Sequence, residues 1–205
     1  MNDNQPERRV RIFCAVELPE LVRARAAAHI ARLREAAARL PIKISWERAE
    51  KLHLTLKFLG EIEPARVEAL QRAANRAAAS VGKFEARLQG AGTFPASGNP
   101  RVLWLGLEDE TNAIAQLQEQ LEAECALENF PRETRAFHPH ITIARIRIPV
   151  AAPARRLAKL HNEMGFEPPA SFNVNDLTVM QSELGAGGSR YTPLSRYELK
   201  PEAGD

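Results

Sequence analysis

The chain has few cysteines, few aromatic residues and little excess charge. Its 205 residues include only two cysteines, Cys14 and Cys125, which lie far apart and match no metal-ligand spacing. A secreted domain of this size would commonly carry a disulfide framework, so we expect a reducing, cytoplasmic environment. The formal charge of +2 comes from 28 basic and 26 acidic residues and excludes a polybasic tail. Any contact with nucleic acid must therefore be local.

Long apolar runs are also missing. No stretch approaches the roughly 18 residues needed to cross a bilayer, and the N-terminus lacks the apolar segment of a signal peptide. We therefore expect no association with a membrane. With 44% hydrophobic and 26% charged residues, the composition is that of a globular protein, and the length favours one compact domain or two small lobes.

The apolar periodicity predicts alternating strands and helices. Strands are expected at residues 10–16, 42–46, 51–59, 101–107, 138–148, 172–180 and 190–199, and helices at 20–40, 65–81, from Thr111 to Cys125, and between Pro153 and Gly165. No flexible linker interrupts these elements, so the pattern predicts an α+β fold of two lobes that share a core, with a pair of helices on one face of each sheet. Residues 1–8 are expected to be disordered and residues 9–200 to form a single bilobal domain.

Two of the predicted strands carry the same short motif. HLTL begins at His53 and HITI at His140, and two such His-x-Thr coincidences are expected by chance at only about 0.01. Residues i and i+2 of a strand point to the same face, roughly 6.6 Å apart. Each motif therefore presents an imidazole beside a hydroxyl, that of Thr55 in the first strand and that of Thr142 in the second.

Two such half-sites that face each other would suit hydrolysis of a phosphoester without a metal. One neutral imidazole would remove a proton from the attacking group, one protonated imidazole would donate to the leaving oxygen, and the hydroxyls would hold phosphate oxygens. Histidine suits both roles because its ordinary pKa is about 6.5. One alternative is that both histidines are structural and form hydrogen bonds with the backbone. The other is a zinc site, but no third ligand is evident and neither an HExxH nor a CxxC motif occurs.

Five segments resemble a known family. RIFCAVELP, LHLTLKFLGE, RVLWLGL, FHPHITIAR and SELGAGGSRYTPLSRYEL occur in that order, and together they resemble the bacterial RNA 2′,3′-cyclic phosphodiesterases, also called 2′-5′ RNA ligases, of the two-histidine phosphoesterase superfamily. The resemblance covers residues 9 to 199 and implies a bilobal α+β fold, with two antiparallel sheets lining a central cleft and helices on the outside. It also implies that His53 is the proton donor and His140 the proton acceptor, with Thr55 and Thr142 binding phosphate.

The resemblance implies an enzyme that hydrolyses the 2′,3′-cyclic phosphate end of an RNA or oligonucleotide to a 2′-phosphate. We expect a monomer that uses no metal and no nucleotide cofactor, since neither a phosphate loop nor an adenylated-lysine motif occurs. Joining or cleaving a 2′-5′ linkage is the same chemistry with a ribose hydroxyl in place of water, so the sequence does not separate these reactions. A module that binds RNA ends without turnover is an alternative from another class, which the intact histidines of both motifs disfavour.

Four further residues could contact the substrate. Arg145 matches the arginine of the HITIAR segment and is a candidate phosphate ligand, yet strict alternation puts it on the face opposite the motif histidine, so only a bulge or the end of the strand would turn it to the cleft. Lys57, by alternation, shares a face with the first motif histidine. Phe13 could stack on a nucleotide and Tyr191 could close over a ligand, with packing in the sheet as the alternative for both.

Overall fold

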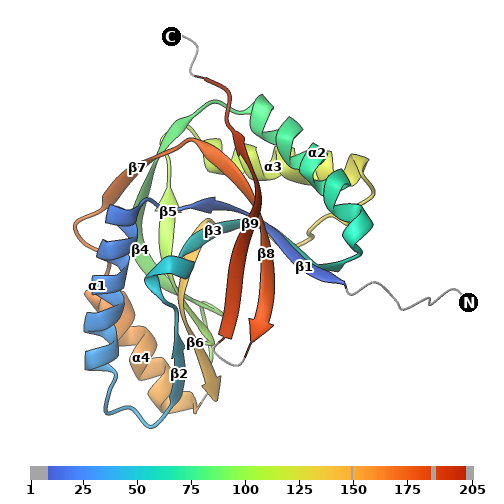
Figure 1. Ribbon diagram of the computed structural model, residues 1–205. Coiled ribbons are helices and arrows are strands. Elements are labelled where there is room, and N and C mark those ends of the chain that lie inside the picture. Colours follow the sequence, from blue (N-terminus) through green and yellow to red (C-terminus); the bar gives the residue numbers. More distant parts are fainter. Residues whose placement is uncertain (1–8, 149, 186–187, 202–205) are drawn as a thin grey trace, which may run out of the picture.

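The computed structural model describes residues 9–148, 150–185 and 188–201 (Figure 1). The predicted disordered segment, residues 1–8, lies outside the described residues. The helices are α1 (Glu20–Ala36), α2 (Val67–Ser80), α3 (Ala113–Leu127) and α4 (Ala151–Met164). The strands are β1 (Val10–Glu17), β2 (Lys43–Trp46), β3 (His53–Ile62), β4 (Phe84–Phe94), β5 (Val102–Glu108), β6 (His140–Ile148), β7 (Ala170–Val174), β8 (Asp176–Gly185) and β9 (Gly188–Glu198).

These strands form two antiparallel sheets. One has the order β3-β1-β8-β9 and the other the order β2-β6-β5-β4-β7. Helices α2 and α3 pack on the first sheet, and α1 and α4 pack on the second, so each sheet has one helix pair on its outer side (Figure 1). The predicted α+β fold with two antiparallel sheets and outer helices is therefore confirmed.

Each lobe takes elements from both halves of the chain. In the four-stranded sheet β1 pairs with β3 on one side and with β8 on the other, so the N-terminal strand lies between a neighbour in sequence and the C-terminal hairpin. One continuous core joins the lobes and includes Leu54, Leu70 and Leu105, which are almost fully buried. The two lobes consequently cannot fold as separate halves of the chain.

The outer helices bury small and aliphatic side chains. Helix α2 turns Leu70 and four alanines to the interior, and small side chains allow it to lie close against α3. Helix α3 begins at Ala113, and the carboxylate of Asp109 accepts hydrogen bonds from the backbone N–H groups of Ala113 and Ile114, at 2.6 and 3.2 Å. Asp109 therefore caps this helix in place of the predicted start at Thr111.

The strands differ from the prediction in one unexpected strand and in several boundaries. Strand β4 was not expected, because Gly90 and Gly92 interrupt its alternation of apolar residues. Strand β3 continues past Gly60, which adopts a φ of 71° that glycine tolerates without strain, and ends at Ile62. The expected strand at 172–180 is two strands, β7 and β8, separated at Asn175.

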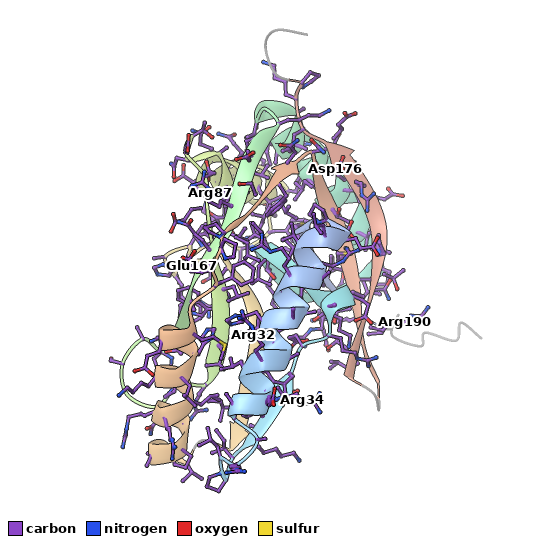
Figure 2. The ribbon with its side chains drawn as sticks, turned by 90° about the vertical axis from the view of Figure 1, so that its left-hand side faces the viewer. Arg32, Arg34, Arg87, Glu167, Asp176 and Arg190 are labelled. Carbon is purple, nitrogen blue, oxygen red and sulfur yellow. The ribbon has the colours of Figure 1, made fainter. Side chains whose placement is uncertain are left out.

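Helix α1 lies on the outside of the five-stranded sheet beside α4. Figure 2, turned by 90°, shows Arg32 and Arg34 along this outer helix. Neither this helix nor any other in the described part of the chain is long and apolar enough to cross a membrane.

Candidate active site

The two motif strands come into contact where the sheets face each other. His53 and Thr55 of β3, and His140 and Thr142 of β6, line a single cavity of about 470 Å³. All four side chains are partly exposed to this cavity. The structure thus brings the two predicted half-sites together.

Both motif histidines are oriented in the same way. Nδ1 of His53 donates to the carbonyl of Lys51 at 2.7 Å, and Nδ1 of His140 donates to the carbonyl of His138 at 2.6 Å. Because a carbonyl only accepts, the Nδ1 proton is fixed and Nε2 is the atom left for chemistry in each neutral ring. The Thr55 hydroxyl lies 3.0 Å from Nε2 of His53, to which it donates when the ring is neutral and from which it accepts when the ring is protonated. In both halves, the carbonyl of the residue two positions before the histidine therefore selects the tautomer of the ring.

The surroundings of the two imidazoles change their pKa values. Burial lowers the pKa of His53 and of His140, and the positive charge of Arg145 lowers both further. The carboxylate of Glu17 acts in the opposite direction on His53 and raises its pKa, whereas no carboxylate among the described residues has this effect on His140. Of the two rings, His53 is thus the one beside a group that favours its protonated form.

Aromatic side chains hold the rings in place. The ring of Phe13 stacks on His53, with centroids 4.8 Å apart and planes inclined by 29°, and Tyr191 packs edge-on against both rings. On the other side, the ring of Phe94 packs edge-on against His140 at 4.9 Å. Phe13 is only 3% exposed, so its main contact is this packing, although it also lines the cavity.

A second aromatic neighbour of His140 depends on a glycine. The ring of Trp104 lies 6.3 Å from the imidazole of His140 and packs against Phe94. A Cβ on Gly92 of the adjacent strand would lie 2.2 Å from the Trp104 ring. Only glycine therefore leaves room for this indole behind the active site.

A bulge in β6 turns Arg145 into the cavity. Thr142 pairs with Trp104, but the next residue of β5, Leu103, pairs with Ala144, so Ile143 is an extra residue. Ile143 and Ala144 are both buried, and Arg145 then lines the cavity. This is the bulge that the sequence required for Arg145 to reach the cleft.

A matching bulge in β3 turns Lys57 away from the cavity. Leu56 is the extra residue between the pairs Thr55–Ala15 and Lys57–Cys14. Lys57 is 5% exposed, and its ammonium group donates to Glu122 at 2.7 Å and to the carbonyl of Pro131 at 2.8 Å. The expectation that Lys57 shares the face of His53 is therefore wrong, because the bulge reverses the alternation after Leu56.

The cavity has a strongly basic lining. It holds five cationic side chains and one carboxylate, that of Glu47: the cations are Arg11, Arg48, Lys51, Arg145 and Arg147. Within the described part of the chain, neither Arg145 nor Arg147 forms an ion pair with a carboxylate. Such a cleft attracts an anionic ligand.

Sequence reasoning missed Phe58, Arg48, Lys51 and Arg147 in this lining. Phe58 is the second residue after Leu56, the bulge residue of β3, and Arg147 follows Arg145 at the i+2 position. For Phe58 and Arg147 the only signal in the sequence was the alternation itself, which becomes correct once each bulge is known.

Metal ligation has no obvious place in the described residues. No group of three or more His, Cys, Asp or Glu side chains there could hold a metal ion. Independence of the reaction from metal remains a prediction.

The sequence of this chain matches a known family. The model of the 2′-5′ RNA ligase superfamily matches residues 21–186, and the chain belongs to that superfamily. Among the relatives is the RNA 2′,3′-cyclic phosphodiesterase of Aeropyrum pernix, which is 34% identical over 172 residues, covering 83% of this chain and 94% of the relative. The enzyme of the same name from Escherichia coli is 32% identical over 193 residues, covering 92% and 96%.

Solved structures of similar proteins agree with this assignment. A crystal structure of a Thermus thermophilus protein has a TM-score of 0.72 and 31% identity, covering 94% of this chain and 99% of that one. The structure of Escherichia coli LigT complexed with 3′-AMP has a TM-score of 0.69 and 31% identity, covering 93% and 98%.

Proposed function

We propose that this protein is an RNA 2′,3′-cyclic phosphodiesterase, a hydrolase that opens the 2′,3′-cyclic phosphate at the end of an RNA or oligonucleotide to leave a 2′-phosphate. The observation that carries the proposal is the pair of imidazoles, each with a fixed Nδ1 proton and an available Nε2, in one basic cavity. Relatives over most of the chain carry this name.

The reaction would be general acid–base catalysis between the two histidines. Nε2 of neutral His140 takes a proton from water as the water oxygen bonds to phosphorus. The bond from phosphorus to the 3′-oxygen breaks, and Nε2 of protonated His53 gives its proton to that oxygen. In-line displacement places the attacking and leaving oxygens on opposite sides of phosphorus, which suits histidines supplied by two facing sheets.

The assignment of the acid to His53 follows the family resemblance. Burial lowers the pKa of both rings, and the carboxylate of Glu17 favours the protonated form of His53, which agrees with that assignment. After one turnover His53 is neutral and His140 protonated, and exchange of protons with solvent restores the starting state.

The remaining predicted residues would hold the phosphate. The hydroxyls of Thr55 and Thr142 supply hydrogen bonds to the non-bridging oxygens, and the guanidinium of Arg145 adds a charge-assisted pair of donors. Such donors act where charge develops in the transition state, and Arg145 has the planar fork that matches two phosphate oxygens. None of these steps uses a metal ion.

Identification of the product tests the proposal. Purified protein is incubated, with excess chelator, with an oligonucleotide ending in a 2′,3′-cyclic phosphate. The expected product ends in a 2′-phosphate and a 3′-hydroxyl, at a rate that the chelator does not lower. A 3′-phosphate product would contradict the assignment of the leaving oxygen, and loss of activity restored by a divalent ion would contradict the proton-transfer mechanism.

Formation or cleavage of a 2′-5′ linkage is the second candidate. It would use the same two histidines, with a ribose hydroxyl in place of water, and the superfamily carries the name of that reaction. Addition of a second oligonucleotide with a free 5′-hydroxyl to the same assay would detect a joined product.

A further inference from the structure

The cavity continues beyond the motif residues toward Phe58. Thr55 pairs with Ala15 and Phe58 pairs with Phe13, so Phe58 lies two residues farther along the sheet, about 7 Å from Thr55. Phe58 lines the cavity and is 51% exposed. An apolar ring of this size is left half open to solvent on the wall of a basic cleft.

A cation lies over this exposed ring. The guanidinium carbon of Arg11 is 4.7 Å from the centroid of Phe58, and Arg11 lines the same cavity. An aromatic ring beside an arginine is the combination on which proteins stack an unpaired nucleobase. The pair of Phe58 and Arg11 lies beyond the hydroxyls that would bind the phosphate. It is therefore available to the nucleotide next to the terminal one.

The charge of the cleft exceeds what one cyclic phosphate requires. The lining holds five cationic side chains and one carboxylate, whereas a cyclic phosphodiester carries a single negative charge. Arg147 lies two residues beyond Arg145 on β6, about 7 Å farther along the strand and on the same wall. Arg147 extends the positive charge along β6, and Arg11 supplies positive charge beside the exposed ring of Phe58.

We propose that Phe58 and Arg11 form a subsite for a second nucleotide, the one joined to the 5′ side of the cyclic-phosphate end. Phe58 stacks on its base, and Arg11 holds the phosphate that links it to the terminal nucleotide. This inference rests on the proposed function and names its substrate class: RNA chains of two or more nucleotides rather than cyclic mononucleotides.

Comparison of three substrates tests the subsite. They are a nucleoside 2′,3′-cyclic phosphate, a dinucleotide ending in the same group, and that dinucleotide without its first base. We expect kcat/KM of the intact dinucleotide to exceed that of the mononucleotide at least about tenfold, and Phe58→Ala to lower this ratio to near one. Removal of the first base should have a similar effect on the wild type, and Phe58→Trp should restore the ratio.

Two further variants separate stacking from charge and from general effects. Arg11→Gln should weaken the dependence of dinucleotide KM on salt, because one phosphate contact is lost. Leu127→Ala removes a side chain that is 73% exposed on α3 and does not line the cavity, and it should leave the substrate ratio unchanged. An equal loss for the mononucleotide and dinucleotide in Phe58→Ala would overturn the subsite, as would a wild-type ratio near one.

Failure of the proposed function would be recognised separately. If neither cyclic phosphate is hydrolysed, equilibrium binding of a mononucleotide and a dinucleotide that end in a 3′-phosphate is measured by tryptophan fluorescence. Tighter binding of the dinucleotide that is lost in Phe58→Ala would support the subsite in a binding protein. Equal binding of the two would overturn it.

Discussion

Phe58 and Arg145 occupy equivalent positions in the two halves of the candidate active site. Each stands five residues after its motif histidine, and each follows a bulge of one extra residue, Leu56 in β3 and Ile143 in β6. Both side chains line the cavity for this reason. The same backbone device therefore places an aromatic ring on one wall and a guanidinium group on the other.

Substitution of either histidine should nearly abolish turnover. His53→Ala and His140→Ala are each expected to lower kcat roughly 10²- to 10⁴-fold, the range for a positioned general acid or base. Thr55→Ala and Thr142→Ala should cost less, because each hydroxyl is one of several donors to phosphate. Steady-state assays of the single and double variants measure this.

The double histidine variant is the control for a single site. It should be little worse than either single variant, because residues that act as a unit are strongly non-additive. Effects that simply multiply would mean that the two motifs work independently.

The pH dependence follows from the lowered pKa values of both rings. Catalysis needs one imidazole protonated and the other neutral, so kcat/KM should be bell-shaped with a maximum below pH 6.5, falling toward neutral pH as His53 loses its proton. Bound anionic substrate favours the protonated imidazole, so the profile of kcat should lie at higher pH. A maximum of kcat/KM above pH 7 would contradict this account.

Arg145 is expected to affect both binding and titration. Arg145→Gln removes a forked donor to phosphate and should lower kcat/KM roughly 10²-fold. It also removes a charge that lowers the pKa of both histidines, so the optimum of kcat/KM should move to higher pH. Arg101→Gln, an exposed arginine outside the cavity lining, should change neither. Arg145 would be excluded from the site if its variant behaved like this control.

The buried ion pair of Lys57 and Glu122 is expected to stabilise the fold and not to take part in catalysis. Glu122 accepts from Lys57 and also from the backbone N–H of Glu133 at 3.2 Å, so the pair joins β3 to α3 and to the loop that leads to β6. Lys57→Met leaves a buried carboxylate without its cation, and the free energy of unfolding should fall by about 3–5 kcal/mol. Urea denaturation followed by tryptophan fluorescence measures the change.

Two controls accompany that measurement. The double variant Lys57→Met with Glu122→Leu removes both charges and should recover much of the loss. Arg135→Ala breaks an exposed ion pair with Glu133 and should barely alter stability. Equal effects of Lys57→Met and Arg135→Ala would show that the buried pair has no special role.

The sequence by itself determined the half-sites. The apolar alternation of β3 and β6 predicted two strands, and the i, i+2 spacing put His53 beside Thr55 and His140 beside Thr142, because that period is a property of any strand. The helical periodicity likewise predicted four helices, although α1 ends at Ala36 rather than at residue 40. These features depend on neighbours along the chain, so local reasoning sufficed.

Tertiary structure decided everything that depended on pairing between strands. A bulge is a mismatch between two paired strands, and the sequence of one strand alone does not reveal it. The burial of Lys57 and the exposure of Phe58 and Arg145 to the cavity could therefore be predicted only from the pairing of β3 with β1 and of β6 with β5. The same holds for the lobes, in which β1 lies between β3 and β8. The sequence named the imidazoles and hydroxyls, but packing of the two sheets brought them to one cavity and set the pKa values of the histidines through burial and charges from distant segments.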